Sequence, residues 1–192
     1  ALDMEIGIYN TCALLDNDQL KCWGWNSVGQ LGTGDNNHRG DSNIELGDNL
    51  SYVNLGAGRT VTDFSASGNF SCALLDDSTI KCWGKNSSGN LGIGDTLNRG
   101  ASPEEMGDNL PTVNFGLNRY AIKIATSEIA CAVLDDNSTK CWGNNSPGYL
   151  GIGDTSNRGD SPEEMGDNLP TVNIGSNRAI SDLSGASDFT CV

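Results

Sequence analysis

Residues 71–84 read SCALLDDSTIKCWG, and two close copies of this stretch stand elsewhere in the chain. TCALLDNDQLKCWG occupies residues 11–24, and ACAVLDDNSTKCWG occupies residues 130–143. The first cysteine of each copy, with one more near the end of the chain, gives the series Cys12, Cys72, Cys131 and Cys191, spaced by 60, 59 and 60 residues. A fixed period of this length is the mark of a repeat architecture.

The segment after each copy repeats as well. It begins NSVGQLGTGD at residue 26, NSSGNLGIGD at residue 86 and NSPGYLGIGD at residue 145. A second segment, GDNL followed two residues later by VN, comes next in all three units. The one slip in register lies between Arg119 and Cys131, where a single residue is missing. The repeat therefore fills the chain and leaves no room for a separate catalytic domain.

Each unit reads as β-structure. CALLD and the run before KCW are short, apolar or β-branched, and separated by Asp, Asn and Ser residues that favour turns. VTDFSAS (61–67) and YAIKIATS (120–127) predict a strand before each hairpin, and TVNFG and TVNIG are candidates for a short strand after it. The glycine-rich GxLGxGD segment is turn material, and only PEEMGDN suits a single helical turn. The chain is predicted to be all-β, with three or four short antiparallel strands in each unit.

A unit of this size cannot bury both faces alone, and radial stacking of neighbouring units solves that problem. The recurring CALLDD, KCWG and GxLGxGD motifs resemble the regulator of chromosome condensation repeat, over essentially the whole chain. The resemblance implies a β-propeller, usually of seven blades. The founding member of that family is a nuclear exchange factor for a small GTPase, while relatives serve as binding scaffolds. This chain departs from the founder in its acidity, its paired cysteines and its elongated GDNLPTVN segment.

The repeat boundaries predict one array, with blades centred on 1–59, 60–119 and 120–178, and with 179–192 opening a fourth. Seven blades of about 60 residues need roughly 420 residues, and three blades leave unpaired sheet edges. We therefore expect a portion of a longer polypeptide that forms a larger, seven-bladed propeller. An open superhelical array, or closure through other chains, remains an alternative.

The charge balance excludes two classes of partner. The chain carries 11 Lys and Arg against 25 Asp and Glu, a formal net charge of −14. Nucleic acids and anionic membrane surfaces are bound through clustered cations, so neither is an expected partner. No apolar run is long enough to span a bilayer, and the opening residues ALDMEIG carry no signal-peptide pattern.

The cysteines predict a compartment. They fall as Cys12 and Cys22, Cys72 and Cys82, and Cys131 and Cys141, with Cys191 left over. A hairpin turn between the members of a pair places them opposite each other on neighbouring strands, close enough for a disulfide after modest adjustment. Disulfides indicate an oxidising compartment, whereas buried thiols are the alternative. Zinc is not expected, because there is no CxxC motif and only one histidine.

Asparagines in N-x-S/T sequons agree with an extracellular location. These glycosylation candidates are Asn49, Asn69, Asn86, Asn137 and Asn144. Asn137, at a hairpin tip, and Asn49, in a loop, are the better candidates. Since the chain is rich in Asn and Ser, chance occurrence is the competing explanation.

No pattern of residues predicts catalysis or a cofactor. His38 is the single histidine, and the aligned positions hold Asn98 and Asn157, so it is interpreted as a loop substitution. RGDS occurs at residues 39–42 and 158–161 and is similar to the integrin-recognition tripeptide, but the repeat itself explains the Arg-Gly pair. We expect no enzyme activity and no cofactor.

Carboxylates gather in GDTSNRGDSPEEMGDN, which makes Asp154, Asp160 and Asp167 weak calcium candidates. Local pairing of Arg39, Arg99 and Arg158 with Asp35, Asp95 and Asp154 is the favoured interpretation.

The tryptophans that follow the second cysteines, Trp23, Trp83 and Trp142, are predicted to pack between blades on the face opposite the cysteine. Trp25 is extra to the repeat and is a candidate for an exposed ligand-stacking residue.

The sequence thus favours a non-catalytic extracellular scaffold, secreted or on the cell surface. It would serve as a surface, filament, appendage or adhesion component that binds proteins or self-assembles, with glycans attached. The alternative is a secreted binding propeller with one dedicated partner, such as an inhibitor or a lectin-like protein. A small-GTPase exchange factor is disfavoured because its reducing compartment is at odds with paired cysteines.

Overall fold

The computed structural model describes residues 1–192 except 176–177, 179, 181–182, 187–188 and 192. Three antiparallel sheets of three strands each follow one another along the chain. The strands are β1 (Asp3–Ile6), β2 (Asn10–Leu14) and β3 (Leu20–Gly24) in blade 1; β4 (Val61–Ala66), β5 (Phe70–Leu75) and β6 (Ile80–Gly84) in blade 2; and β7 (Ala121–Thr126), β8 (Ile129–Leu134) and β9 (Thr139–Gly143) in blade 3. Among the described residues there is no α-helix, so the predicted all-β class is confirmed.

A further hairpin, β10 (Ser184–Ala186) and β11 (Phe189–Cys191), follows blade 3. Ser184 pairs with Cys191 across it. The same register joins Ser65 to Cys72 in blade 2 and Ala125 to Cys131 in blade 3. The backbone of this hairpin therefore repeats the inner half of a blade.

The connections between blades differ from the sequence prediction in one respect. Each holds two short 3₁₀ turns: η1 (Asn43–Glu45) and η2 (Gly47–Asn49), η3 (Pro103–Glu105) and η4 (Gly107–Asn109), and η5 (Pro162–Glu164) and η6 (Gly166–Asn168). The expected strand at TVNFG and TVNIG is wrong, because only single bridges form there, from Thr112 to Lys81 and from Thr171 to Lys140.

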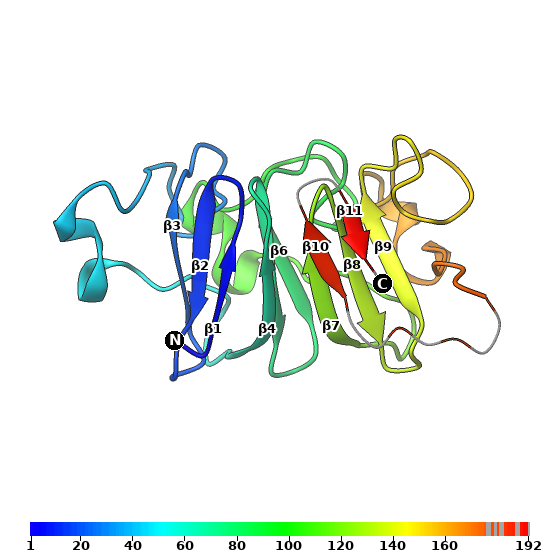
Figure 1. Cartoon of the computed structure of the whole chain (residues 1–192), viewed down its shortest axis with the longest axis horizontal. Helices are drawn as coiled ribbons and strands as arrows, with labels where there is room; N and C mark the ends of the chain where they lie inside the picture. Colours follow the sequence, from blue (N-terminus) through cyan, green and yellow to red (C-terminus); the bar gives the residue numbers. More distant parts are fainter. Residues whose placement is uncertain (176–177, 179, 181–182, 187–188, 192) are drawn as a thin grey trace.

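Consecutive blades pack face to face, with the sheets in sequence order (Figure 1), and the inner strand β4 contacts both β1 and β7. One apolar cluster lies between blades 1 and 2 and includes Cys12, Leu20, Phe64 and Trp83. A second lies between blades 2 and 3 and includes Phe70, Cys82, Ile124 and Trp142. All six residues of β5 are buried, because both faces of blade 2 are covered.

The Cys-Trp dipeptide of each outer strand explains how one blade joins two neighbours. Successive side chains of a strand point to opposite faces, so Cys82 faces the cluster shared with blade 3 while Trp83 faces the cluster shared with blade 1. Trp83 and Trp142 are fully buried. The prediction that the tryptophans pack between blades is confirmed for Trp83 and Trp142 but not for Trp23, which is half-buried.

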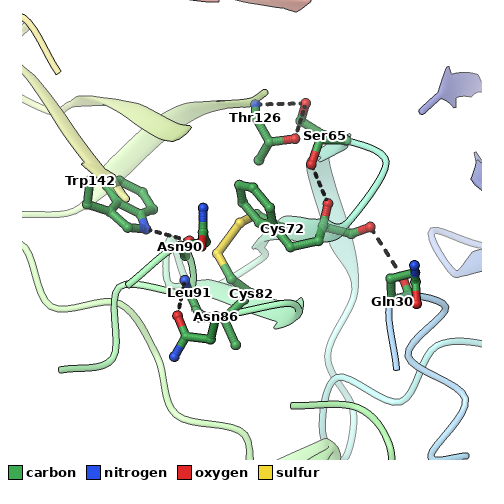
Figure 2. The surroundings of a disulfide bond; sticks show 12 residues. Gln30, Ser65, Cys72, Cys82, Asn86, Asn90, Leu91, Thr126 and Trp142 are labelled. Atoms are coloured by element: carbon green, nitrogen blue, oxygen red, sulfur yellow. Dashed lines mark hydrogen bonds between the residues drawn. A yellow bond between two sulfur atoms is a disulfide. The ribbon is translucent and has the colours of Figure 1, made fainter. Parts of the chain in front are cut away.

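Each buried indole also makes a hydrogen bond across the interface. Trp83 Nε1 donates to the carbonyl oxygen of Gln30 at 3.1 Å. Trp142 Nε1 donates to the carbonyl oxygen of Asn90 at 3.1 Å (Figure 2). Because an indole N–H that is buried without an acceptor costs about 1–3 kcal/mol, this bond fixes the loop of one blade against the outer strand of the next.

A buried lysine in each of blades 2 and 3 joins the chain segments that connect its blade to the neighbouring blades. Lys81 Nζ donates to the carbonyl oxygens of Leu55, at 3.0 Å, and Gly107, at 2.7 Å. Lys140 repeats the pattern with Phe115 and Gly166. Burial lowers the pKa of both lysines, and the carboxylates Asp108 and Asp167 oppose that shift. The ammonium group therefore links the connection before its own blade to the connection after it.

Side chains of one blade cap the open edge of the next inner strand. The N–H groups of Ile124 and Thr126 on β7 donate to the Asp63 carboxylate, at 3.2 Å, and to Ser65 Oγ, at 3.0 Å. Burial raises the pKa of Asp63, and the amides of Ile124 and Phe64 counteract that shift. An exposed strand edge invites pairing with other chains, and these caps block it.

Blade 1 keeps one face uncovered. Leu46 is 39% exposed, whereas the aligned Met106 and Met165 are 2% and 7% exposed. Trp23 is half-buried, and no carbonyl group within the described residues accepts its indole N–H. The η1 and η2 segment stands away from the sheets at the blade 1 end of the molecule (Figure 1).

Substitutions at two glycines, Gly92 and Gly58, test how closely the loop of blade 2 packs against the indole of Trp142. An added Cβ at Gly92 would lie 2.7 Å from Trp142 Nε1, whereas one at Gly58 would meet nothing within 4 Å. Both glycines have positive φ, +66° and +72°. Gly58→Ala is expected to cost only the left-handed penalty of about 1–2 kcal/mol, and Gly92→Ala about 1–3 kcal/mol more, in urea unfolding. Equal losses in the two variants would contradict the interlocked packing.

Candidate functional site

The loops at one end of the blades are organised by a buried asparagine in each unit: Asn26, Asn86 and Asn145, all 0% exposed. Asn86 Oδ1 accepts the N–H of Leu91 at 2.9 Å, and its Nδ2 donates to the carbonyl oxygens of Asp95, at 2.8 Å, and Leu97, at 3.1 Å. The bond to Leu91 holds that side chain in the interface (Figure 2).

Asn86 is therefore wrong as a glycosylation candidate, because a buried amide with these partners cannot carry a glycan in the folded chain. Asn49 and Asn137 are exposed, and Asn69 and Asn144 are half-buried. Asn137 lies in the β8–β9 turn with φ +62°. These four positions stay predictions.

An arginine closes each loop. Arg99 pairs with the Asp95 carboxylate at 2.6 Å, and the same 2.6 Å pair joins Arg39 to Asp35 and Arg158 to Asp154. The other terminal nitrogen of each guanidinium donates to two backbone carbonyl oxygens nearby. The predicted local pairing is confirmed. The arginines of both RGDS strings, Arg39 and Arg158, are therefore bound to partners within their own loops.

The three calcium candidates do not form one site. The N–H of Ser156 and the Arg158 guanidinium lower the pKa of Asp154 and occupy its carboxylate. Asp167 Oδ1 accepts the N–H of Leu117 at 3.2 Å. Asp160, the third candidate, interacts with the neighbouring Glu164. Burial raises the pKa of Glu164, and Asp160 adds to that shift. Within the part of the chain that the structure describes, no three His, Cys, Asp or Glu residues gather as metal ligands, so the calcium hypothesis has no support.

Each predicted cysteine pair is a disulfide. Cys12–Cys22, Cys72–Cys82 and Cys131–Cys141 are bonded across directly opposed residues, and the Cα atoms lie 4.1 Å apart in all three. The sulfurs are buried in the clusters that join one blade to the next. The side chain of Cys191 lies outside the described residues.

The ends of the blades line a cavity of about 320 Å³ that is open to solvent. Its walls come from three turns between inner and middle strands, at Gly7 and Ile8, Gly68 and Asn69, and Ser127 and Glu128, and from residues that follow the outer strands of blades 2 and 3. The cavity therefore depends on all three blades.

Blade 1 also carries a stacked aromatic pair, Trp25 and His38. The rings of Trp25 and His38 stack with centroids 4.2 Å apart and planes 20° from parallel. Trp25 is 49% exposed, as its extra position in the sequence predicted. His38 Nδ1 accepts the N–H of Asn26, so the lone histidine has a structural partner in the loop.

Comparison with known proteins agrees with this construction. The family model of the regulator of chromosome condensation (RCC1) repeat matches residues 3–30 and 61–90, which cover the strands of blades 1 and 2. Over these two segments the chain is similar to RCC1-repeat proteins. Each of the three blades carries a disulfide between its paired cysteines.

Two curated relatives are much longer than this chain, which spans less than a third of either. It is 27% identical over 155 residues to the ultraviolet-B receptor UVR8 of Arabidopsis thaliana, which is 79% of this chain and 31% of the relative. It is 28% identical over 147 residues to the human E3 ubiquitin-protein ligase HERC2, which is 76% of this chain and 3% of the relative.

Among solved structures, Prp20p of Saccharomyces cerevisiae superposes with a TM-score of 0.69 at 14% identity, over 98% of this chain and 42% of the yeast protein. At this identity the likeness shows the fold alone, and it confirms the propeller-type architecture. The yeast study also concerns binding to Gsp1p and histones, which is a statement about Prp20p.

Sequence reasoning missed two groups that the structure makes important. The lysine of KCWG was passed over although it recurs in all three units, and the asparagine of the NSxG segment was considered only as part of a sequon. Recurrence of a polar residue at a fixed place in every unit was the available signal. The cavity had no such signal, because its walls come from residues about one repeat apart.

The role of the loop asparagine can be tested by Asn86→Asp. The new carboxylate would face the carbonyl oxygen and carboxylate of Asp95, where the amide now donates. We expect a loss of about 2–4 kcal/mol in urea unfolding at pH 7. The loss should shrink as the pH falls toward 4, because protonation restores a donor. Asn144→Asp keeps the oxygen that accepts the N–H of Ser146 and is expected to change stability by less than about 0.5 kcal/mol.

Removal of one disulfide tests its contribution. The double variant Cys72→Ala and Cys82→Ala is expected to lose about 2–4 kcal/mol of unfolding free energy, because the unfolded chain regains the freedom of the closed loop. Urea unfolding of the wild type and the variant, each with and without reductant, is the measurement. A variant as stable as the oxidised wild type would contradict a stabilising role.

Proposed function

We propose that this chain is part of a non-catalytic extracellular scaffold, secreted or on the cell surface, that binds proteins or assembles with copies of itself. The observation that carries the proposal is the buried disulfide at the same register in every blade. Reducing compartments keep thiols reduced, so a scaffold that relies on three such bonds fits an oxidising environment.

The loop ends of the blades supply the binding surface. Loops held by a rigid framework are where binding residues concentrate, and each loop here is fixed by its asparagine and by its arginine pair. The net charge of −14 favours partners with a basic or neutral contact surface.

The absence of catalysis is part of the proposal. His38, the single histidine, stacks on Trp25 and accepts a backbone N–H, which suits a structural role in the loop.

Across the described residues, no helix is long and apolar enough to cross a membrane.

We also propose that further repeats of the same kind complete the array, as in a seven-bladed propeller. The open face of blade 1 supports this. Trp23 and Leu46 occupy the positions that Trp83 and Met106 fill in blade 2, where a preceding blade buries them. A preceding repeat with a loop like that of Gln30 would supply the missing carbonyl acceptor for Trp23.

A secreted propeller with one dedicated partner is the second candidate. The aromatic pair on blade 1 favours it, because Lys85 and Asn98 take the places of Trp25 and His38 in blade 2. A surface that differs between blades suits one specific partner better than a regular lattice. An exchange factor for a small GTPase fits the buried disulfides less well.

Non-reducing peptide mapping of protein from its native source tests the compartment. The expected result is three linked peptide pairs, Cys12–Cys22, Cys72–Cys82 and Cys131–Cys141. Glycans, where present, should sit on Asn49 or Asn137, and Asn86 should be bare. Alkylated, unlinked cysteines in all three pairs would overturn the extracellular proposal.

Electron microscopy and light scattering of the same protein separate the two candidates. A regular array or filament supports the structural component, whereas a discrete particle that co-purifies with one other protein supports the dedicated binder. A protein that both methods show as a single particle, without self-assembly and without a bound partner, would contradict both candidate functions.

A further inference from the structure

We propose that the cavity at the loop ends of blades 1–3 is a binding site for a neutral oligosaccharide, with Trp25 as the stacking platform at its margin. The proposal adds a ligand class to a chain otherwise assigned to protein binding. It does not depend on the extracellular assignment.

The cavity has the size and construction of a ligand site. Its volume of about 320 Å³ falls at the lower end of the roughly 300–1,000 Å³ typical of small-molecule pockets. Backbone hydrogen bonds support its walls, since the N–H of Gly7 donates to Asn10 and that of Ser67 to Phe70. A pocket between three interlocked blades is formed before a ligand arrives.

Polar side chains around the cavity have unused hydrogen-bonding capacity. Asn69, Lys85, Ser87 and Glu128 line it, and none of their side chains has a hydrogen-bond or ion-pair partner among the described residues. Together they offer an amide, an ammonium group, a hydroxyl group and a carboxylate, so both donors and acceptors face one space. A ligand whose hydroxyl groups donate and accept in turn matches this set.

The charges disfavour an anionic ligand. The lining of the cavity holds one cation, Lys85, and two carboxylates, Glu5 and Glu128. Burial raises the pKa of Glu5, and the neighbouring Asp3 and Asp63 add to the shift. An acidic sugar or a phosphate would enter a region without excess positive charge, whereas a neutral sugar carries no such penalty.

Trp25 and Tyr9 occupy, on blade 1, the two positions whose counterparts line the cavity on blades 2 and 3. The N–H of Trp25 donates to the Tyr9 carbonyl oxygen at 2.8 Å, which continues the β2–β3 ladder beyond Asn10. In blade 2 the two aligned residues are Lys85 and Asn69, and in blade 3 they are Asn144 and Glu128. Those four residues line the cavity, as does Ile8 next to Tyr9.

Both aromatic rings are open to a ligand, since Trp25 is 49% and Tyr9 57% exposed. Trp25 Nε1 donates to Ser27 Oγ at 2.6 Å and one ring face is stacked with His38, so the ring is held in place. A pyranose ring has an apolar C–H face and a rim of hydroxyl groups. An immobilised indole covers the face, and the amide, hydroxyl and charged groups of the cavity bind the rim.

Calorimetric titration of the chain with neutral trisaccharides tests the site. The probes are cellotriose, maltotriose and N,N′,N″-triacetylchitotriose, with trigalacturonic acid as the charged control. We expect at least one neutral probe to bind with a Kd below about 1 mM and the charged probe to bind at least about tenfold more weakly. No binding of any neutral probe up to about 10 mM would overturn the proposal.

Variants locate the binding. Trp25→Ala and Asn69→Ala are each expected to weaken the bound trisaccharide by about tenfold. Ile44→Ala alters a side chain that is 77% exposed in η1, outside the cavity wall, and should leave affinity unchanged. Unchanged melting temperatures would show that the variants remain folded. Saccharide binding that survives Trp25→Ala would contradict the assigned site.

Protein capture is the competing outcome. If Trp25→Ala abolishes binding of a native protein partner and no saccharide binds the wild type, the platform is a protein interface and the saccharide proposal is wrong. Disulfide mapping reports on the compartment by itself, so failure of one proposal leaves the other standing.

Discussion

The hydrogen bond from a tryptophan indole to a loop carbonyl of the preceding blade is the contact on which the rest of the structure depends. Trp142 reaches Asn90, and Trp83 reaches Gln30, over the same 3.1 Å. The acceptor must stand at one place, so the loop that carries it must have one conformation. Gly92 can have no Cβ there, because the indole lies against it.

The loop is held in that conformation by polar side chains from its own unit. Asn86 binds the amide of Leu91 and the carbonyl groups of Asp95 and Leu97, and Arg99 closes the loop onto Asp95. Leu91 then fills the interface beneath the indole. The disulfide lies in the same apolar cluster, joined to the strand that carries Trp83 on its other face. Blade 2 thus offers a fixed carbonyl acceptor to blade 3 on one face and anchors its own indole to blade 1 on the other.

Sequence alone predicted the parts of this arrangement that recur within one unit. The 60-residue period, the hairpin, the cysteine pairing and the burial of Trp83 and Trp142 all follow from local pattern and strand alternation. The burial of Asn86 could not be derived in this way. An N-S-S sequence fits a glycosylated turn as well as a buried asparagine that holds a loop together. The bonds to residues nine and eleven positions away show that Asn86 is the second kind.

Contacts between units were harder to foresee. Lys81 binds carbonyl groups on both sides of its blade, 26 residues before and 26 after it in sequence. The expected strand at TVNFG is replaced by one bridge, which joins Thr112 to this lysine. The cavity likewise arises only when three blades pack together, so its residues carry no common sequence motif.

Hydrogen exchange of the four indole N–H groups, followed by NMR, tests the account most directly. Trp83 and Trp142 are buried and bonded to carbonyl oxygens, so their exchange requires separation of two blades. We expect these two signals to exchange at least about a hundredfold more slowly than those of Trp25 and Trp23. Exchange at a common rate for all four would contradict a structure built on interlocked blades.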